Sequence, residues 1–314
     1  MPMRVFDADA VARSLPYDLL TDALAAAFAT DTDVPARAHH TIKVPGARDG
    51  TLLLMPAWTS GDSLGVKIVN VFPDNAKHGL AAVHGSYLLM DATSGVFRAM
   101  MDGTELTLRR TACASALASR YLSRAESRIL LMVGTGKLAP HMIAAHATVR
   151  PIREVRIWGR RLSAAKELAD ELGDMPFETV AVDDLEAAVK DADIVSCATL
   201  ASDPLVQGAW LRPGQHLDLV GAFTPQMREA DADAIGRAAL FVDTYAGATS
   251  EAGEIVQAIQ GGIIKATDLR ADLAGLVRGM HAGRTSDEEI TLFKSVGTAL
   301  EDLAAAKLVA GDET

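Results

Sequence analysis

Three cationic side chains lie in stretches that are otherwise poor in charge, where an anion would be a suitable partner. Arg37 occurs in VPARAHH, Lys67 in the apolar run LGVKIVNVF, and Arg110 at the start of RTACASALASRYL. Burying a lysine between valine and isoleucine is costly unless an opposite charge accompanies it. The three residues therefore indicate a site for an anionic group. Each has an alternative: Lys67 on an outward-facing edge strand, Arg37 on the plain surface, and Arg110 paired with a nearby acid.

A glycine-rich turn near the middle of the chain is the second feature with chemical meaning. Gly134, Gly136 and Ala139 form the pattern G-x-G-x-x-A directly after an apolar run and directly before a helical pattern. The first glycine permits a tight turn, the second lets the backbone approach a pyrophosphate, and the small third residue allows close helix–strand packing. Free N–H groups at the helix start attract the phosphate charge. The pattern predicts a dinucleotide site; an ordinary βα turn serving another ligand is the alternative.

The end of the following strand predicts which dinucleotide binds. NAD sites place an acidic residue there, which accepts a hydrogen bond from the ribose 2′-hydroxyl. This chain has Gly159, Arg160 and Arg161 instead. Because arginine binds a phosphate through two parallel hydrogen bonds, NADP(H) is expected in preference to NAD(H). A solvated arginine pair at a helix start is the other interpretation of the same residues.

Alternating strand and helix patterns surround the glycine turn. Buried apolar strands that alternate with amphipathic helices predict an α/β fold with a doubly wound, Rossmann-type parallel sheet. The strand-like runs are 128–133, 154–159, 177–182, 193–199, 216–222 and 239–244, and the helical stretches are 138–150, 163–173 and 184–192.

The two ends of the chain have a different pattern. Residues 18–30 predict an amphipathic helix, residues 51–58 and 63–73 predict strands, and residues 86–103 predict a hairpin that turns at Thr-Ser-Gly. The tail, residues 286–309, predicts one long helix that begins in an acidic turn. We expect its alanine-rich part to return to the first domain, which would then be discontinuous.

Composition limits the classes of function. With a formal net charge of −11, the chain lacks the basic surface of a nucleic-acid-binding protein. The sequence shows no secretory apolar segment and no apolar run of membrane-spanning length, so a cytoplasmic protein without a membrane partner is expected. Cys113 and Cys197 lie in apolar stretches and are expected as free, buried residues. No spacing of histidines or cysteines is typical of a metal site, so no metal is predicted.

Six segments together resemble the ornithine cyclodeaminase/mu-crystallin family. They are GVKIVNVFPDN, LLLMPAW, RTACASALAS, VGTGKLAP, VGAFTPQMRE and FKSVGTALED, and they span the chain from about residue 30 to residue 305. The resemblance implies a homodimer, with a substrate-binding and dimerisation domain from residues 1–118 and 295–314 around an NADP-binding Rossmann domain at 119–294. It also implies that Arg37, Lys67 and Arg110 hold the carboxylate of an amino or imino acid.

The resemblance assigns further residues to the cofactor site. We expect this site to comprise Gly134, Thr135, Gly136, Lys137 and Leu138 at the pyrophosphate turn, Gly159, Arg160 and Arg161 at the ribose, Thr199, Val220 and Gly221 along the cleft, and Ser295 near the nicotinamide.

Two departures from the family pattern bear on the reaction. Where ornithine cyclodeaminases carry an acidic residue that handles the side-chain amine, this chain has Phe223, and a second acidic position is occupied by Leu53. Without these carboxylates, deprotonating the distal ammonium of a diamine has no evident agent, so cyclodeamination is disfavoured.

An imine reductase of this family fits the remaining residues best. NADPH would reduce Δ1-pyrroline-2-carboxylate, or its six-membered analogue Δ1-piperideine-2-carboxylate, to L-proline or L-pipecolate. We expect Lys67 and Arg110 as the catalytic residues, with Lys67 influencing the protonation of the imine. The substrate-binding residues are expected to be Arg37, Lys67, Arg110, Met55, His84, Phe223, Thr224 and Val296, with His84 also a conceivable proton donor.

Four alternatives are retained. Three are enzymes of the same family: a cis-3-hydroxy-L-proline dehydratase, an ornithine cyclodeaminase and an alanine dehydrogenase, the last requiring ammonia. The fourth is a non-enzymatic ligand-binding protein. Arg37, Lys67 and Arg110 make it less favoured, because a protein that only binds a ligand does not need three buried cations at one carboxylate.

Overall fold

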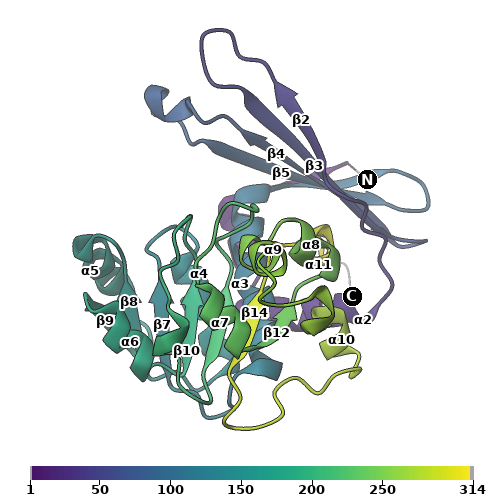
Figure 1. Ribbon diagram of the computed structural model, residues 1–314. Helices are drawn as coiled ribbons and strands as arrows, with labels where there is room; N and C mark the ends of the chain where they lie inside the picture. Colours follow the sequence, from purple (N-terminus) through teal and green to yellow (C-terminus); the bar gives the residue numbers. More distant parts are fainter. Residues whose placement is uncertain (1, 312–314) are drawn as a thin grey trace. The chain divides into compact units, whose positions relative to one another are not determined.

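The chain folds into two compact units in the computed structural model, which describes residues 2–311 (Figure 1). Unit 1 comprises Met1–Arg110 and Thr298–Thr314, and unit 2 comprises Thr111–Gly297. The boundaries expected from the sequence fall at 118/119 and 294/295, and residue 1 and residues 312–314 of that expected first domain lie outside the described residues.

Unit 1 is built on a six-stranded sheet with the order β1-β6-β5-β4-β3-β2. All neighbours are antiparallel except β1 and β6. The strands are β1 Arg4–Phe6, β2 Ala38–Ile42, β3 Gly50–Thr59, β4 Ser63–Val71, β5 Val83–Asp91 and β6 Phe97–Asp102. The hairpin predicted around Thr-Ser-Gly is confirmed as β5–β6.

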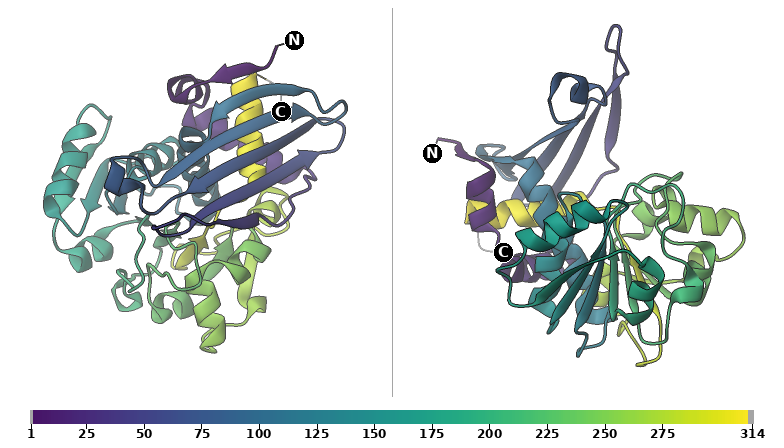
Figure 2. Two further views of the ribbon diagram at one scale, coloured as in Figure 1. Left: turned by 90° about the horizontal axis from the view of Figure 1, so that it is seen from above. Right: turned by 90° about the vertical axis from the view of Figure 1, so that its left-hand side faces the viewer.

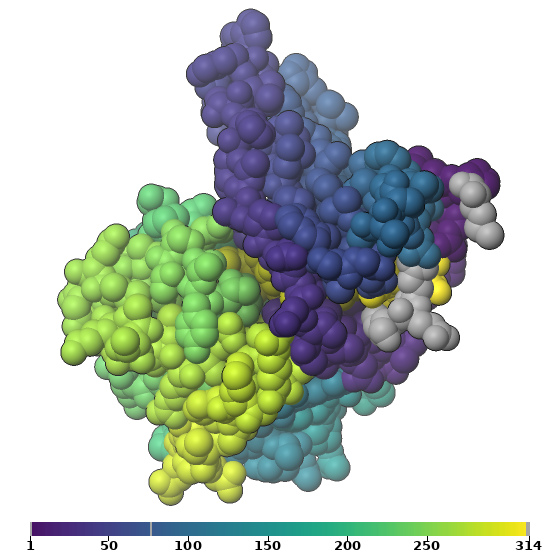
Figure 3. Space-filling model, turned by 90° about the vertical axis from the view of Figure 1, so that its right-hand side faces the viewer, coloured from purple at the N-terminus to yellow at the C-terminus, as the bar shows by residue number. Residues whose placement is uncertain are grey.

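Helices cover one face of this sheet. They are α1 Ala8–Ser14, α2 Tyr17–Ala29 and the C-terminal helix α11 Ala299–Ala310, which packs against β3, β4, β5 and α2 (Figure 2). Alternate residues of the central strands point to the helices and are buried, among them Met55, Lys67 and Tyr87. The far ends of the β2–β3 and β4–β5 hairpins project from the rest of unit 1 as a narrow lobe (Figure 3).

The helix that carries Arg110 begins earlier than its apolar stretch indicates. Helix α3 spans Gly103–Leu122, whereas its apolar stretch begins only at Arg110. The Asp102 carboxylate accepts a hydrogen bond from the backbone N–H of Glu105 at 2.8 Å and so caps the helix at its true start.

Unit 2 contains an eight-stranded, wholly parallel sheet with helices on both faces (Figure 2), which confirms the predicted doubly wound class. Its order is β13-β12-β14-β11-β10-β7-β8-β9. The strands are β7 Ile129–Val133, β8 Glu154–Trp158, β9 Glu178–Val182, β10 Ile194–Cys197, β11 His216–Leu219, β12 Ala239–Val242, β13 Leu269–Asp272 and β14 Thr291–Lys294. The helices are α4 Ala139–Val149, α5 Leu162–Glu171, α6 Leu185–Asp191, α7 Ala232–Arg237, α8 Tyr245–Ser250, α9 Gly253–Gln260 and α10 Leu273–Val277.

The expected single helix at 286–309 is wrong. Thr291–Lys294 forms strand β14 between β11 and β12, and helix α11 begins only at Ala299. All four residues of β14 are buried, so pairing on both sides outweighs the local helix preference. Gly297, at φ +80°, interrupts the chain between the two elements.

A buried carboxylate ties helices α3 and α4 to the sheet of unit 2. Asp218 on β11 accepts hydrogen bonds from Ser115 at 2.8 Å and Ser196 at 2.7 Å, and it lies 3.2 Å from Nε2 of His146. Burial alone would raise the pKa of Asp218, but the hydrogen bond and charge of His146 hold it below its usual value.

Two kinds of feature are absent from the described residues. No helix within residues 2–311 has the length and apolar character needed to cross a membrane. The same residues contain no group of three or more histidine, cysteine, aspartate or glutamate side chains arranged to hold a metal ion.

Candidate functional site

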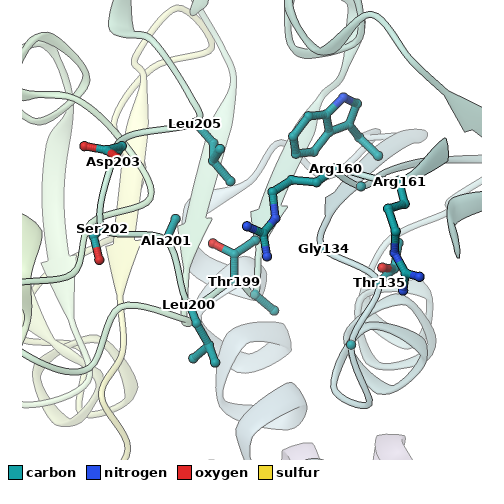
Figure 4. Close-up of a pocket in the computed structure, with 14 residues that line it drawn as sticks. Gly134, Thr135, Arg160, Arg161, Thr199, Leu200, Ala201, Ser202, Asp203 and Leu205 are labelled. Atoms are coloured by element: carbon teal, nitrogen blue, oxygen red, sulfur yellow. The ribbon is translucent and has the colours of Figure 1, made fainter.

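A pocket of about 900 Å³ opens at the carboxyl ends of the strands of unit 2 (Figure 4). This edge of a doubly wound sheet is where such folds bind ligands. Its lining residues are Gly134, Thr135, Gly136, Trp158, Gly159, Arg160, Arg161, Ala198, Thr199, Leu200, Ala201, Ser202, Asp203 and Leu205. Seven of the expected cofactor residues are among them, whereas Lys137, Leu138, Val220, Gly221 and Ser295 are not.

The surrounding atoms require a glycine at one position of the turn but not at the other. Gly134 has φ +126°, and a Cβ there would lie 2.7 Å from the carbonyl oxygen of Ala198, so the protein itself requires a glycine. A Cβ on Gly136 would meet no described atom within 4 Å. Packing within unit 2 therefore does not require a glycine at position 136, and the backbone there is open to a ligand in the pocket.

Arg160 and Arg161 extend from the turn after β8 and leave it in different directions (Figure 4). Both side chains are exposed, and within residues 2–311 neither forms an ion pair. Arg161 precedes helix α5 without capping it. Two unneutralised guanidinium groups thus border the pocket at the position where NAD sites carry an acid.

A buried aspartate holds the loop that follows β14. One oxygen of Asp243 accepts hydrogen bonds from Ser295 Oγ at 3.1 Å, Val296 N at 2.7 Å and Gly297 N at 2.6 Å. The backbone of the expected nicotinamide-side residues is therefore fixed by a side chain that the sequence patterns did not single out.

Lys67 and Arg110 meet inside unit 1, where both are almost fully buried. Lys67 Nζ lies 2.9 Å and 2.8 Å from the two carboxylate oxygens of Asp302. Arg110 Nε lies 3.0 Å from Asp302 Oδ1, and its Nη1 lies 2.5 Å from Glu301 Oε2. The structure thus shows the alternative in which Arg110 pairs with an acid. Lys67 also pairs with an acid, Asp302, which lies on the same helix as Glu301.

Glu301 and Asp302 lie in the first turn of α11, where the helix dipole favours negative charge. They were missed in the sequence, although the signal was present: the argument that a buried lysine needs a partner applies equally to two acids in the apolar run TALEDLAAAKL. We call Lys67, Arg110, Glu301 and Asp302 the charge cluster.

Burial and neighbouring charges set the protonation of the charge cluster. Burial lowers the pKa of Lys67 to about 8, with Asp302 opposing the shift and Arg110 adding to it. Burial alone would raise the pKa of Asp302, but Lys67 and Arg110 hold it below its usual value. Lys67 can therefore gain and lose a proton near neutral pH while Asp302 stays ionised.

The other expected substrate residues of unit 1 divide between the two faces of the sheet. Met55 pairs with Lys67 across β3 and β4 and is buried on the same face. Arg37 directly precedes β2, whose first residue pairs with Leu54, the neighbour of Met55. His84 pairs with Asn70 on the opposite face, beside a separate hollow of about 250 Å³, so the sheet does not bring it together with Lys67. Phe223, Thr224 and Val296 belong to unit 2.

The fold and the pocket define a two-unit α/β protein with a Rossmann-type cleft. The chain belongs to the ornithine cyclodeaminase/mu-crystallin family, whose family model matches residues 4–313. It is 41% identical over 282 residues to the Δ1-pyrroline-2-carboxylate reductase of Paracoccus denitrificans, covering 87% of this chain and 89% of that protein.

Two solved structures are similar over almost the whole chain. One is the Δ1-pyrroline-2-carboxylate reductase of Thermococcus litoralis in complex with NADH and L-proline, with a TM-score of 0.91, 33% identity, and coverage of 99% of this chain and 97% of that one. The other is an archaeal alanine dehydrogenase dimer with bound NAD, with a TM-score of 0.91, 30% identity, and coverage of 99% and 96%. Overall fold therefore does not separate these two activities.

We predict that the substitution Asp302→Asn lowers the free energy of unfolding by about 3–5 kcal/mol, because it leaves two buried cations facing one carboxylate. The double variant K67M/D302N should be more stable than D302N, since Arg110 and Glu301 then balance. Urea denaturation followed by circular dichroism measures both. Asp62→Asn is the matched control: it breaks the exposed pair of Asp62 with Lys307 on the same helix and should cost under about 1 kcal/mol. A D302N protein as stable as D62N would contradict the prediction.

Proposed function

We propose that this protein is an NADPH-dependent reductase of cyclic imino acids, which converts Δ1-pyrroline-2-carboxylate, and its six-membered analogue, to L-proline or L-pipecolate. The observation that carries the proposal is the burial of Lys67 and Arg110 side by side inside unit 1, where both contact the carboxylate of Asp302. The names of the Paracoccus and Thermococcus relatives support the same reaction.

The charge cluster suits a substrate that carries both signs of charge. Its two cations and two carboxylates balance formally, and Arg37 would add one positive charge. A protonated cyclic imine with a carboxylate on the adjacent carbon is itself a zwitterion. We infer that Lys67, Arg110 and Arg37 bind its carboxylate and that Met55 lies beside the ring. Phe223, Thr224 and Val296 of unit 2 remain expected substrate-binding residues.

The reaction adds a hydride to the imine carbon and requires a proton on nitrogen. A bound reduced nicotinamide would supply the hydride. Lys67, as an ammonium of lowered pKa, is suited to hold the proton that the ring nitrogen receives. Fixing the carboxylate would orient the C=N carbon, and orientation contributes several kcal/mol to rate acceleration. His84 lies on the other sheet face, so Lys67 is the better-placed donor.

The same proposal includes the cofactor preference, the assembly and the compartment. The arginine pair, and the absence of an acidic residue at Gly159–Arg161 after β8, favour NADP(H) over NAD(H). The outer face of the unit 1 sheet carries apolar side chains in register, such as Trp58, Leu64 and Met90, which a second copy would cover in a homodimer. Cys113 and Cys197 are buried, and within residues 2–311 neither forms a disulfide, as suits the reducing cytoplasm.

We expect purified protein to oxidise NADPH when given Δ1-pyrroline-2-carboxylate without ammonia, with one proline formed per NADPH consumed. Absorbance of the reduced nicotinamide and amino-acid analysis measure the two. The Lys67→Met variant, which lacks the ammonium, should lose most of the activity. Ammonia-dependent activity with pyruvate would instead indicate an alanine dehydrogenase, and pyrroline formed from cis-3-hydroxy-L-proline without NADPH consumption would indicate the dehydratase.

A second expectation concerns Arg160 and Arg161. Replacing both by alanine should raise the KM for NADPH by about 10–100-fold and change the KM for NADH by less than about threefold, because only NADPH carries the 2′-phosphate. Steady-state kinetics with each cofactor gives the comparison. Arg153→Ala, an exposed arginine of the same unit outside the pocket lining, is the control and should change neither value. Equal effects on both cofactors would refute the preference.

The pH profile tests the role of Lys67. We expect kcat/KM to fall as the pH rises through about 8, where Lys67 loses its proton. Because the charge of Asp302 raises the pKa of Lys67, D302N should move this fall to lower pH, whereas the control D62N should not. Lys67→Arg should abolish the fall, since arginine does not titrate there. Identical profiles for all four proteins would remove Lys67 as the proton source.

A further inference from the structure

One buried carboxylate in unit 2 joins segments that leave two adjacent strands. Glu229 is fully buried, and its Oε1 accepts hydrogen bonds from Thr199 N at 2.6 Å and Thr199 Oγ1 at 2.8 Å. Its Oε2 accepts from Gly221 N at 2.7 Å. Thr199 follows β10 and Gly221 follows β11, so the side chain fixes one segment against the other at the carboxyl edge of the sheet.

The segments that Glu229 joins form part of the pocket wall. Thr199 lines the pocket directly. The backbone carbonyl of Glu229 also accepts hydrogen bonds from Leu205 N at 2.8 Å and Val206 N at 3.0 Å, and Leu205 is another lining residue. Only glycine fits at position 221, because a Cβ there would lie 1.9 Å from the carbonyl oxygen of Thr199.

Two further buried charged residues, Glu254 and Lys294, lie close to Glu229. Glu254 Oε1 accepts a hydrogen bond from Glu229 N at 2.7 Å, and Glu254 Oε2 lies 3.2 Å from Lys294 Nζ. Burial raises the pKa of Glu229 and the charge of Glu254 adds to the rise, while the charge of Lys294 and the hydrogen bonds from Thr199 oppose it. Lys294 thus favours the ionised form of Glu229, in which both oxygens only accept hydrogen bonds, as the three donors require.

We propose that Glu229 is a positioning residue for dinucleotide binding: its carboxylate, supported by Glu254 and Lys294, holds the Thr199 wall in the shape that the nucleotide contacts. This inference rests on the proposed nucleotide site but not on the identity of the imine substrate. Glu229 itself does not line the pocket, so it acts through Thr199.

The test is NADPH binding by the folded protein, measured by fluorescence titration, together with the melting temperature of each ligand-free variant. Glu229→Gln keeps the shape of the side chain but replaces one acceptor oxygen by an NH₂ group, which then faces an N–H donor. We expect the dissociation constant to rise by about tenfold or more. Glu229→Asp, which keeps the charge but is one methylene shorter, should weaken binding as well and is the second variant if E229Q does not fold.

Asp231→Ala provides a control for general loosening of unit 2. Asp231 Oδ1 also accepts two backbone N–H groups, those of Gly208 and Ala234, both at 2.8 Å, and none of these residues lines the pocket. Because alanine has no acceptor for these groups, D231A should lower the melting temperature but leave the dissociation constant within about twofold of the original.

The outcomes separate the inference from the proposed function. If the wild-type protein binds NADPH and the dissociation constant of E229Q or E229D lies within about twofold of the wild-type value, the inference alone is overturned. A D231A variant that weakens binding equally overturns it as well. A wild-type protein that binds neither NADPH nor NADH overturns the inference and the proposed function together.

Discussion

A buried charge must find an opposite charge, and this requirement organises unit 1. Lys67 on β4 and Arg110 on α3 come from distant parts of the chain, and Asp302 on α11 contacts both. Because Asp302 belongs to the C-terminal helix α11, this helix has to pack beside β4 and α3 from the earlier part of the chain. The discontinuous unit is thus a consequence of charge balance as well as of apolar packing by α11.

Unit 2 uses buried carboxylates in a different way, as acceptors for backbone N–H groups. Asp243 holds the loop after β14, and Glu229 joins the segments after β10 and β11. A parallel sheet delivers its loops to one edge, but short loops leave several N–H groups without partners in secondary structure. Ionised acceptors satisfy them and fix the loops at the same time.

Local patterns were sufficient for much of the fold and for part of the site. The βα alternation and the glycine turn depend on residues close in sequence, so the cleft and its arginine pair could be predicted. Strands β13 and β14 are four residues long and owe their conformation to their neighbours in the sheet, which no local pattern reports. Asp302 escaped notice because its partner Lys67 is 235 residues away. The residue type of His84 suggested a role at the site, but its location could not be predicted, because only the strand register decides which face of the sheet it occupies.

The position of β14 has a bearing on how the polypeptide matures during its synthesis. This strand is the last of unit 2 in the chain, yet it lies between β11 and β12 and is the only bridge joining β12 and β13 to the other strands within the described residues. The nascent sheet is therefore left as two separate pieces until residues 291–294 have left the ribosome. Helix α11 follows immediately, so unit 1 also stays incomplete until the segment after β14 has been made. Until then the unpaired strand edges of both pieces are exposed, and such edges tend to pair with other chains.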